Sequence, residues 1–134
     1  MGYGVPWWYR RGYMYTISKT FRFEASHMLV GLPDDHQCSR LHGHSYRIEV
    51  ELQGDTLTEE GWVRDYGDLD RIKGYIADAL DHRHLNSIVP QPTAEHLARY
   101  LHDMWIHWYP DMTAVSVYET ASTKATYSPC RGTL

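Results

Sequence analysis

Apolar and polar side chains alternate along two stretches in the first half of the chain, residues 13–25 and 45–54. Strict alternation predicts β-strands with one buried face, because successive side chains of a strand point to opposite sides. Glycine, proline and two adjacent aspartates predict a loop over residues 29–41 between the strands. We expect residues 61–65 to form a further short extended piece.

The spacing of apolar residues becomes helical in the second half of the chain. They recur every three or four positions across residues 69–80, and Asp65 or Asp68 is available as the helix cap. A second helix is predicted to begin after Thr93 and to bury a stripe of apolar residues within 97–108, with a proline just beyond its end.

Two more strand-like stretches close the chain, at residues 114–119 and 122–127. The order strand, strand, helix, helix, strand, strand predicts an α+β fold. We expect a four-stranded antiparallel sheet with both helices on one face, since such a sheet buries both helical stripes. The uncovered face and the open edges of this sheet favour self-association.

The length and composition restrict the class of protein. A chain of 134 residues fits one domain, which we assign to residues 13–130, with an N-terminal extension of unknown role at 1–12 and a tail at 131–134. A formal charge of −4 without a Lys/Arg block argues against a nucleic-acid surface. No apolar stretch approaches the roughly 20 residues of a membrane helix.

The chain contains two cysteines, Cys38 and Cys130. Two cysteines make no disulfide framework, so we expect reduced thiols and a cytoplasmic protein. Cys130 lies in a polar tail and is interpreted as an incidental exposed thiol.

Histidines and a thiol gather in the stretch Cys38-Ser39-Arg40-Leu41-His42-Gly43-His44, with His27 upstream. His42 and His44 leave the same face of a strand, and His27 continues the apolar face of the first strand. All three are therefore predicted to point inward from adjacent strand ends. Three imidazoles without a fourth protein ligand make an open zinc site with Cys38 beside it. The alternative is a group of hydrogen-bonded core histidines.

The pattern F-x-x-x-H followed by C-x3-H-G-H resembles the zinc and thiol motif of the 6-pyruvoyltetrahydropterin synthase family. The short gap between Cys38 and His42 is most similar to its bacterial branch, 6-carboxytetrahydropterin synthase of the 7-deazaguanine (queuosine) pathway. The resemblance extends from about residue 15 to residue 127. It implies the tunnelling fold, in which the sheets of three subunits join into a barrel, two rings stack into a hexamer (a dimer of trimers), and the active sites lie between subunits.

The stretch from Leu80 to Asn86 matches the L-D-H-x-x-L-N element of the same family. The resemblance implies that Asp81 orients His82 and that His82 helps Cys38 to lose its proton. From the residues alone, we favour a simpler interpretation of His82, a solvated cation that caps a helix end.

Glu119 ends an apolar strand face, and a buried carboxylate needs a partner. The resemblance implies that Glu119 accepts the paired donors of a pterin ring and joins the proton relay. The alternative is a strand-end glutamate that reaches solvent. Thr93 and Glu95 resemble a second pterin-contacting segment, although helix capping is their simpler role.

Taken together, the resemblance implies a zinc-dependent lyase that acts on 7,8-dihydroneopterin triphosphate. Cys38 is the expected general base, zinc the Lewis acid and Glu119 the ring anchor. Loss of triphosphate and acetaldehyde would leave 6-carboxytetrahydropterin. Two alternatives stay open: a pyruvoyl-forming synthase that only eliminates triphosphate, and a non-catalytic structural zinc module in which Cys38 is the fourth ligand.

Overall fold

A computed structural model describes Gly4 and residues 14–130 of the chain. The assigned N-terminal extension, residues 1–12, lies outside the described residues except for Gly4, and the assigned tail, residues 131–134, lies outside them entirely. None of the helices in the described part combines the length and the apolar character needed to cross a lipid bilayer.

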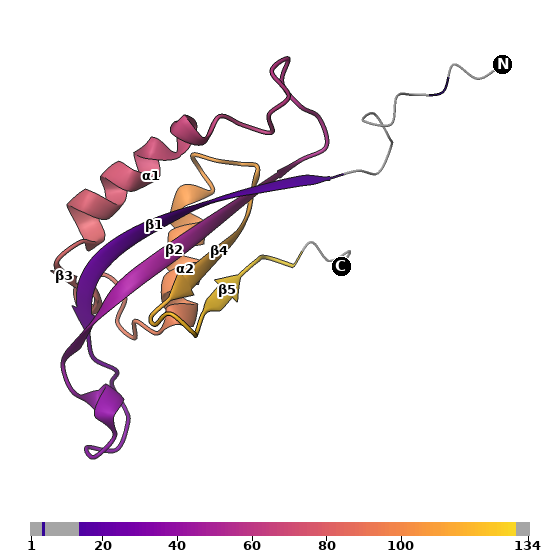
Figure 1. Ribbon diagram of the computed structural model, residues 1–134. Helices are drawn as coiled ribbons and strands as arrows, with labels where there is room; N and C mark the ends of the chain where they lie inside the picture. Colours follow the sequence, from indigo (N-terminus) through magenta and orange to yellow (C-terminus); the bar gives the residue numbers. More distant parts are fainter. Residues whose placement is uncertain (1–3, 5–13, 131–134) are drawn as a thin grey trace.

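The described residues form five strands and two α-helices (Figure 1). In chain order they are β1 (Tyr15–His27), β2 (His42–Gly54), α1 (Asp70–Tyr75), β3 (Arg83–His84), α2 (Ala94–Trp105), β4 (Met112–Tyr118) and β5 (Ala125–Tyr127). Short helical turns add Gln37–Ser39, Tyr66–Leu69, Ile76–Leu80 and Leu85–Ser87. The α+β class predicted from the sequence is confirmed.

The sheet has the strand order β3-β1-β2-β4-β5, and it is mixed rather than antiparallel. The prediction of four antiparallel strands is wrong on this point, because β3 pairs in parallel with the end of β1. Arg83 lies opposite Ala25, and His84 lies opposite Ser26. A two-residue strand inside a polar stretch has no alternation from which it could be recognised. The sheet of one chain is open, and the predicted barrel of several chains stays a prediction.

The β1–β2 pair forms the long axis of the molecule (Figure 1). Its antiparallel register runs from Tyr15 opposite Gly54 to His27 opposite His42. The second strand begins three positions earlier than predicted, because pairing with β1 extends it into a His-Gly-His stretch that has little strand preference of its own.

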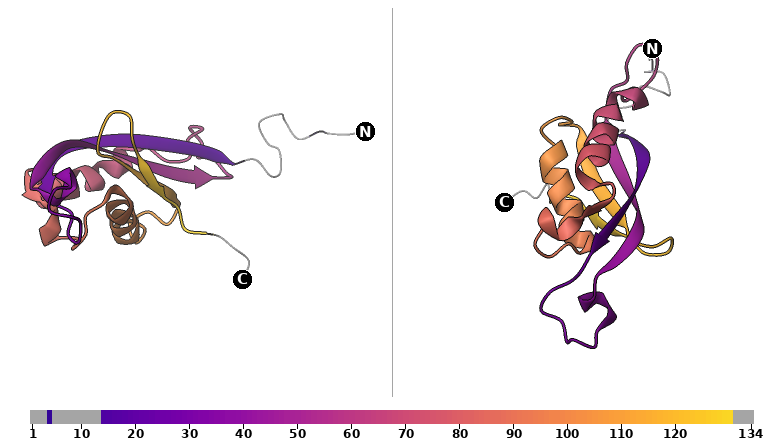
Figure 2. Two further views of the ribbon diagram at one scale, coloured as in Figure 1. Left: turned by 90° about the horizontal axis from the view of Figure 1, so that it is seen from below. Right: turned by 90° about the vertical axis from the view of Figure 1, so that its left-hand side faces the viewer.

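Both helices cover the same face of the sheet, as predicted (Figure 2). Side chains of that face are buried between the sheet and the helices. The sheet contributes Phe21, Phe23, Tyr46, Ile48, Val50 and Leu52, and the helical segments contribute Leu69, Ile72, Ile76, Leu80, Leu97, Leu101 and Trp105. Alternate positions of β2 on the other face are charged and partly exposed, so the hydrophobic core lies on one side only.

The first helical segment combines three kinds of turn. Asp65 caps a 3₁₀ turn by accepting the Gly67 N–H at 2.8 Å, so one of the two predicted caps is correct. After α1 the chain widens into a π turn, in which the Asp81 N–H donates to the Ile76 carbonyl at 2.8 Å. The helical stretch therefore ends at Asp81, as its spacing predicts.

The second helix begins as predicted, because Thr93 Oγ1 accepts the His96 N–H at 3.1 Å. It ends at Trp105, so Trp108 lies in the turn beyond it rather than in the helical stripe. Residues 61–65 form bends and no strand, and Gly61 has a φ of +93° that suits a turn.

Replacing Ile48 by alanine is expected to lower the free energy of unfolding by about 2–5 kcal/mol, because this side chain is fully buried on the central strand. Urea denaturation followed by circular dichroism measures the change. Glu49→Ala, one position along on the other face, should cost less than about 0.5 kcal/mol. Equal losses in the two variants would contradict the assignment of the buried face.

Candidate metal centre

Three histidines meet at the end of the β1–β2 pair. His27 and His42 are direct cross-strand partners, and His44 lies two positions further along β2, opposite Ala25. The shared parity puts all three imidazoles on the face that the helices cover. His27 is buried, and the other two are half-buried. The structure therefore brings these three predicted residues together.

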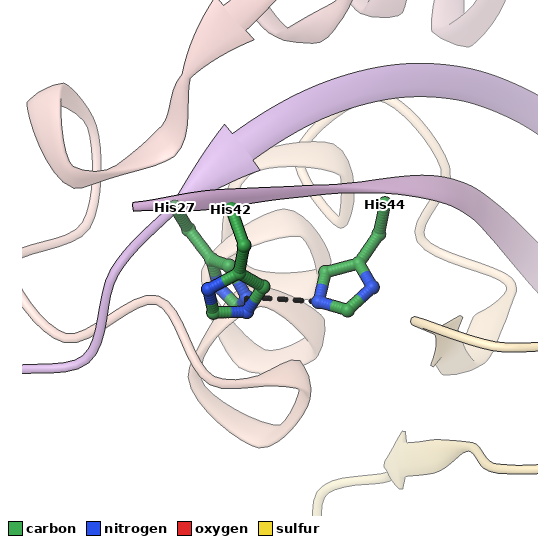
Figure 3. Close-up of side chains that lie close together, drawn as sticks. All are labelled: His27, His42 and His44. Atoms are coloured by element: carbon green, nitrogen blue, oxygen red, sulfur yellow. Dashed lines mark hydrogen bonds between the residues drawn. The ribbon is translucent and has the colours of Figure 1, made fainter. Parts of the chain in front are cut away.

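The Nε2 atoms of the three rings converge on one point (Figure 3). His27 Nε2 lies 2.9 Å from His42 Nε2 and 3.1 Å from His44 Nε2. The ring centroids are 4.5–5.0 Å apart, and the planes are nearly perpendicular. No cysteine or carboxylate of the described residues joins the cluster, whose ligand atoms all lie within 4.8 Å of one another.

Two backbone carbonyls fix the tautomers of this cluster. His27 Nδ1 lies 2.8 Å from the Pro92 carbonyl oxygen, and His42 Nδ1 lies 2.7 Å from the Arg40 carbonyl oxygen. A carbonyl only accepts, so both Nδ1 atoms carry the proton and donate it. The Nε2 atoms of these neutral rings are then bare lone pairs that face each other at 2.9 Å. Such a pair repels unless a cation lies between or beside the two atoms.

The donor set fits a transition-metal ion. Ligating histidines typically donate the second ring N–H to a carbonyl or carboxylate, as His27 and His42 do. A tetrahedral zinc ion with bonds of about 2.0–2.1 Å holds its nitrogen ligands about 3.3 Å apart. The observed separations of 2.9 and 3.1 Å reach that value with a small outward turn of the rings. Three protein ligands leave a coordination position open.

The surroundings favour the neutral form of His44. Burial lowers the pKa of His44 below its ordinary value, and the neighbouring imidazoles add to the effect, whereas the charge of Glu119 opposes it. A neutral imidazole is the form that binds metal.

Cys38 lies in the loop that projects beyond the sheet end between β1 and β2 (Figure 1). The His36 ring caps its 3₁₀ turn, with Nδ1 accepting the Cys38 N–H at 3.1 Å. The Cys38 carbonyl accepts the Leu29 N–H at 2.9 Å, which folds the loop back on itself. The thiol is half-buried and is not a member of the histidine cluster. Cys130 is exposed, as expected.

Asp81 and His82 form the predicted carboxylate–imidazole pair, with His82 Nδ1 3.1 Å from Asp81 Oδ1. The same Oδ1 accepts the Glu24 N–H at 2.9 Å, and this bond, more than His82, lowers the pKa of Asp81. The His82 N–H donates to the Glu24 carbonyl at 2.6 Å. The pair is thus attached to the edge of β1, and within the described chain no contact joins it to Cys38.

His82 has a φ of +57°, the single positive φ of a described residue other than glycine. Its side chain is 78% exposed. A left-handed conformation costs a residue with a side chain about 1–2 kcal/mol. Strain of this kind is often kept where it aims a functional side chain.

Glu119 follows the last residue of β4 and lines a cavity of about 220 Å³ together with Glu95 and Lys124. The structure therefore brings two of the predicted substrate-binding residues together. Thr93 does not line this cavity. Its hydroxyl caps α2, the simpler role considered for it.

Several features of the site have no signal in the sequence. The carbonyls of Pro92 and Arg40 act as backbone atoms, which any residue type supplies. Lys124 joins the cavity only because β5 folds back beside β4. The sequence pattern identifies Tyr46 only as a core position of a strand, whereas the structure packs it edge-on against His27 and His44.

The α+β fold with three inward histidines at one strand end defines a class of protein with a candidate metal site, and comparison with known proteins identifies the family. The profile of the 6-pyruvoyl tetrahydropterin synthase family matches residues 16–130. The solved structure of the 6-pyruvoyl tetrahydropterin synthase of Caenorhabditis elegans superposes with a TM-score of 0.76 and 25% identity, covering 87% of this chain and 96% of that one.

Two curated relatives are named 6-carboxy-5,6,7,8-tetrahydropterin synthase. The protein of Synechocystis sp. is 34% identical over 122 residues, which cover 85% of this chain and 93% of the relative. The protein of Haemophilus influenzae is 41% identical over 73 residues, or 52% of this chain. That match spans half (50%) of the Haemophilus protein. The chain belongs to the 6-pyruvoyl tetrahydropterin synthase family.

Titration with Co²⁺ is expected to show about one ion bound per chain, with the visible absorption of a four-coordinate site. His27→Ala and His44→Ala should each abolish stoichiometric binding, because two imidazoles remain. His107→Ala, at an exposed histidine outside the cluster, is the control and should bind normally. Normal binding by His27→Ala would contradict the assigned cluster.

His82→Gly is expected to be more stable than His82→Ala by about 1 kcal/mol, because glycine adopts a positive φ without strain and alanine does not. Both variants lose the imidazole, so their difference in urea denaturation isolates the backbone. Equal stabilities would show that the left-handed conformation of His82 stores no strain.

Proposed function

We propose that this protein is a zinc-dependent lyase that converts 7,8-dihydroneopterin triphosphate and one water molecule to 6-carboxytetrahydropterin, acetaldehyde and triphosphate. The observation that carries the proposal is the convergence of three imidazoles, two of them with tautomers fixed by backbone carbonyls, with no fourth ligand among the described residues. Membership in the 6-pyruvoyl tetrahydropterin synthase family supplies the substrate class.

His27, His42 and His44 would hold the zinc ion. When bound, zinc supplies Lewis-acid chemistry toward the vicinal hydroxyls of the substrate side chain. The Pro92 and Arg40 carbonyls keep two of the ligands in the neutral tautomer that metal binding requires.

Cys38 is the proposed general base, which takes the proton from the side-chain carbon next to the ring. A thiol is mostly protonated at neutral pH, so it needs a partner to accept its proton. The proposed partner is His82, held by Asp81. Its exposed imidazole is available to a second chain, which fits active sites that lie between the subunits of a hexamer.

Glu119 is the proposed anchor for the pterin ring, since one carboxylate accepts the ring 2-amino group and N3–H side by side. Its cavity also contains Glu95, a second candidate contact. We assign Thr93 to this site only through its capping of α2, which positions Glu95 in the first helical turn.

The choice of product rests on the relatives. Curated relatives named 6-carboxy-5,6,7,8-tetrahydropterin synthase favour the carboxy product. A pyruvoyl-forming synthase remains the second candidate, because the solved structure with the same fold carries that name. A structural zinc module would need Cys38 as fourth ligand, and the position of Cys38 outside the ligand cluster counts against it.

Incubation of the zinc-loaded protein with 7,8-dihydroneopterin triphosphate is expected to yield acetaldehyde and a pterin with the mass of 6-carboxytetrahydropterin. Cys38→Ala should lower turnover by about 10²–10⁴-fold, the usual contribution of a general base, and should keep its metal. Mass spectrometry and a coupled acetaldehyde assay measure both products.

Each other outcome selects an alternative. A pyruvoyl-pterin mass without acetaldehyde would assign the second synthase activity. Absence of turnover by a protein with full metal content would reject the enzyme. Loss of the metal from Cys38→Ala would identify a closed structural site with the thiolate as ligand.

A further inference from the structure

Tyr46 carries a buried polar group for which the described protein supplies no partner. Its side chain is 1% exposed and lies on the inward face of β2. The ring stacks on Phe23, with centroids 5.0 Å apart, and meets the rings of His27 and His44 edge-on. Its hydroxyl oxygen makes no hydrogen bond to any described residue. Buried hydroxyls are almost always paired, so this exception requires an explanation.

Strand register brings Glu119 next to Tyr46. The last pair of the β2–β4 ladder joins Arg47 to Tyr118. Glu119 is the bend residue directly after β4, and continuing the same register by one step would place it opposite Tyr46, on the inward face. Directly opposed residues of an antiparallel pair have Cβ atoms about 4.5–5.5 Å apart. The negative charge of Glu119 also contributes to the raised pKa of Tyr46, which agrees with this placement.

The phenol of Tyr46 is a hydrogen-bond donor that the described residues leave without an acceptor. A carboxylate has about four acceptor positions on its two oxygens. A pterin ring would use two of them, which leaves room for one phenol. Glu119 is only half-buried, so its side chain has freedom to turn toward the hydroxyl.

We propose that Tyr46 is a positioning residue for pterin recognition: when the ring binds, the buried hydroxyl donates to the Glu119 carboxylate and holds it in the orientation that accepts the two ring donors. This inference rests on the proposed function, since it assumes that Glu119 anchors a pterin. Tyr46 then connects the metal centre and the ring anchor, because one face of its ring packs against the imidazoles while its hydroxyl serves the carboxylate.

Tyr46→Phe tests the proposal, since phenylalanine keeps the ring packing and removes only the hydroxyl. We expect the KM for 7,8-dihydroneopterin triphosphate and the Kd for an oxidised pterin, measured by fluorescence quenching, to rise about tenfold, the usual effect of losing a hydrogen bond to a charged group. The kcat should change less than about threefold. Tyr118→Phe, at a neighbouring position on the outward face, is the matched control and should leave KM and Kd unchanged.

Stability measurements separate the positioning role from a purely structural role of the hydroxyl. Under the positioning role, the hydroxyl is unpaired in the free protein, so Tyr46→Phe should leave the free energy of unfolding the same or higher. The visible spectrum of the Co²⁺ form should also stay unchanged. A less stable variant, or an altered Co²⁺ spectrum, would overturn the positioning role.

A double-mutant cycle with Glu119→Gln tests whether Tyr46 acts through Glu119. In the Glu119→Gln background, Tyr46→Phe should add less than about twofold to the Kd. Additive effects would show that the two residues act independently and would overturn the proposal. If wild-type protein binds pterin and Tyr46→Phe binds it equally well, only the positioning role fails. If wild-type protein binds no pterin, the proposed function fails as well.

Discussion

The antiparallel pairing of β1 with β2 runs without interruption from Tyr15 opposite Gly54 to His27 opposite His42. The last pair of this register is also the first pair of the histidine cluster. A slip of one residue would turn every side chain of one strand to the opposite face and would separate the imidazoles. The buried side chains on the same face exclude such a slip, because each displaced position would expose an apolar side chain. They are Phe21 and Phe23 on β1, and Tyr46, Ile48, Val50 and Leu52 on β2. The core and the site therefore depend on one register.

Backbone carbonyls orient the imidazoles that this register brings together. The Pro92 carbonyl that fixes the His27 tautomer belongs to the residue before Thr93, whose hydroxyl starts α2. The start of α2 and the orientation of a candidate metal ligand thus depend on one short segment. The first turn of this helix also carries Glu95, which lines the cavity of Glu119. In this way, packing of α2 on the sheet aligns the candidate metal centre with the candidate pterin cavity.

Residue patterns predict those parts of the fold that repeat with the period of a strand or helix. The buried face of β2 and the cap of α2 follow from them, and the inward direction of His42 and His44 follows from parity. Features set by long-range contacts carry no such period. The parallel pairing of β3 consists of two residues, and the strained backbone of His82 results from attachment to β1. For the same reason, an unpartnered hydroxyl on Tyr46 is invisible until its neighbours are in place.

The loop that carries Cys38 begins and ends at the paired residues His27 and His42. Its length can therefore change on the far side of Arg40, whose carbonyl accepts from the His42 ring, without displacing either imidazole, since the ladder behind the loop fixes both ends. Insertions or deletions there would relocate the sulfur relative to stationary imidazoles. Under the proposed function, the residues that hold the ion and the residue that removes the proton therefore lie on separate pieces of chain, so one scaffold could support different reaction outcomes when only a surface segment changes.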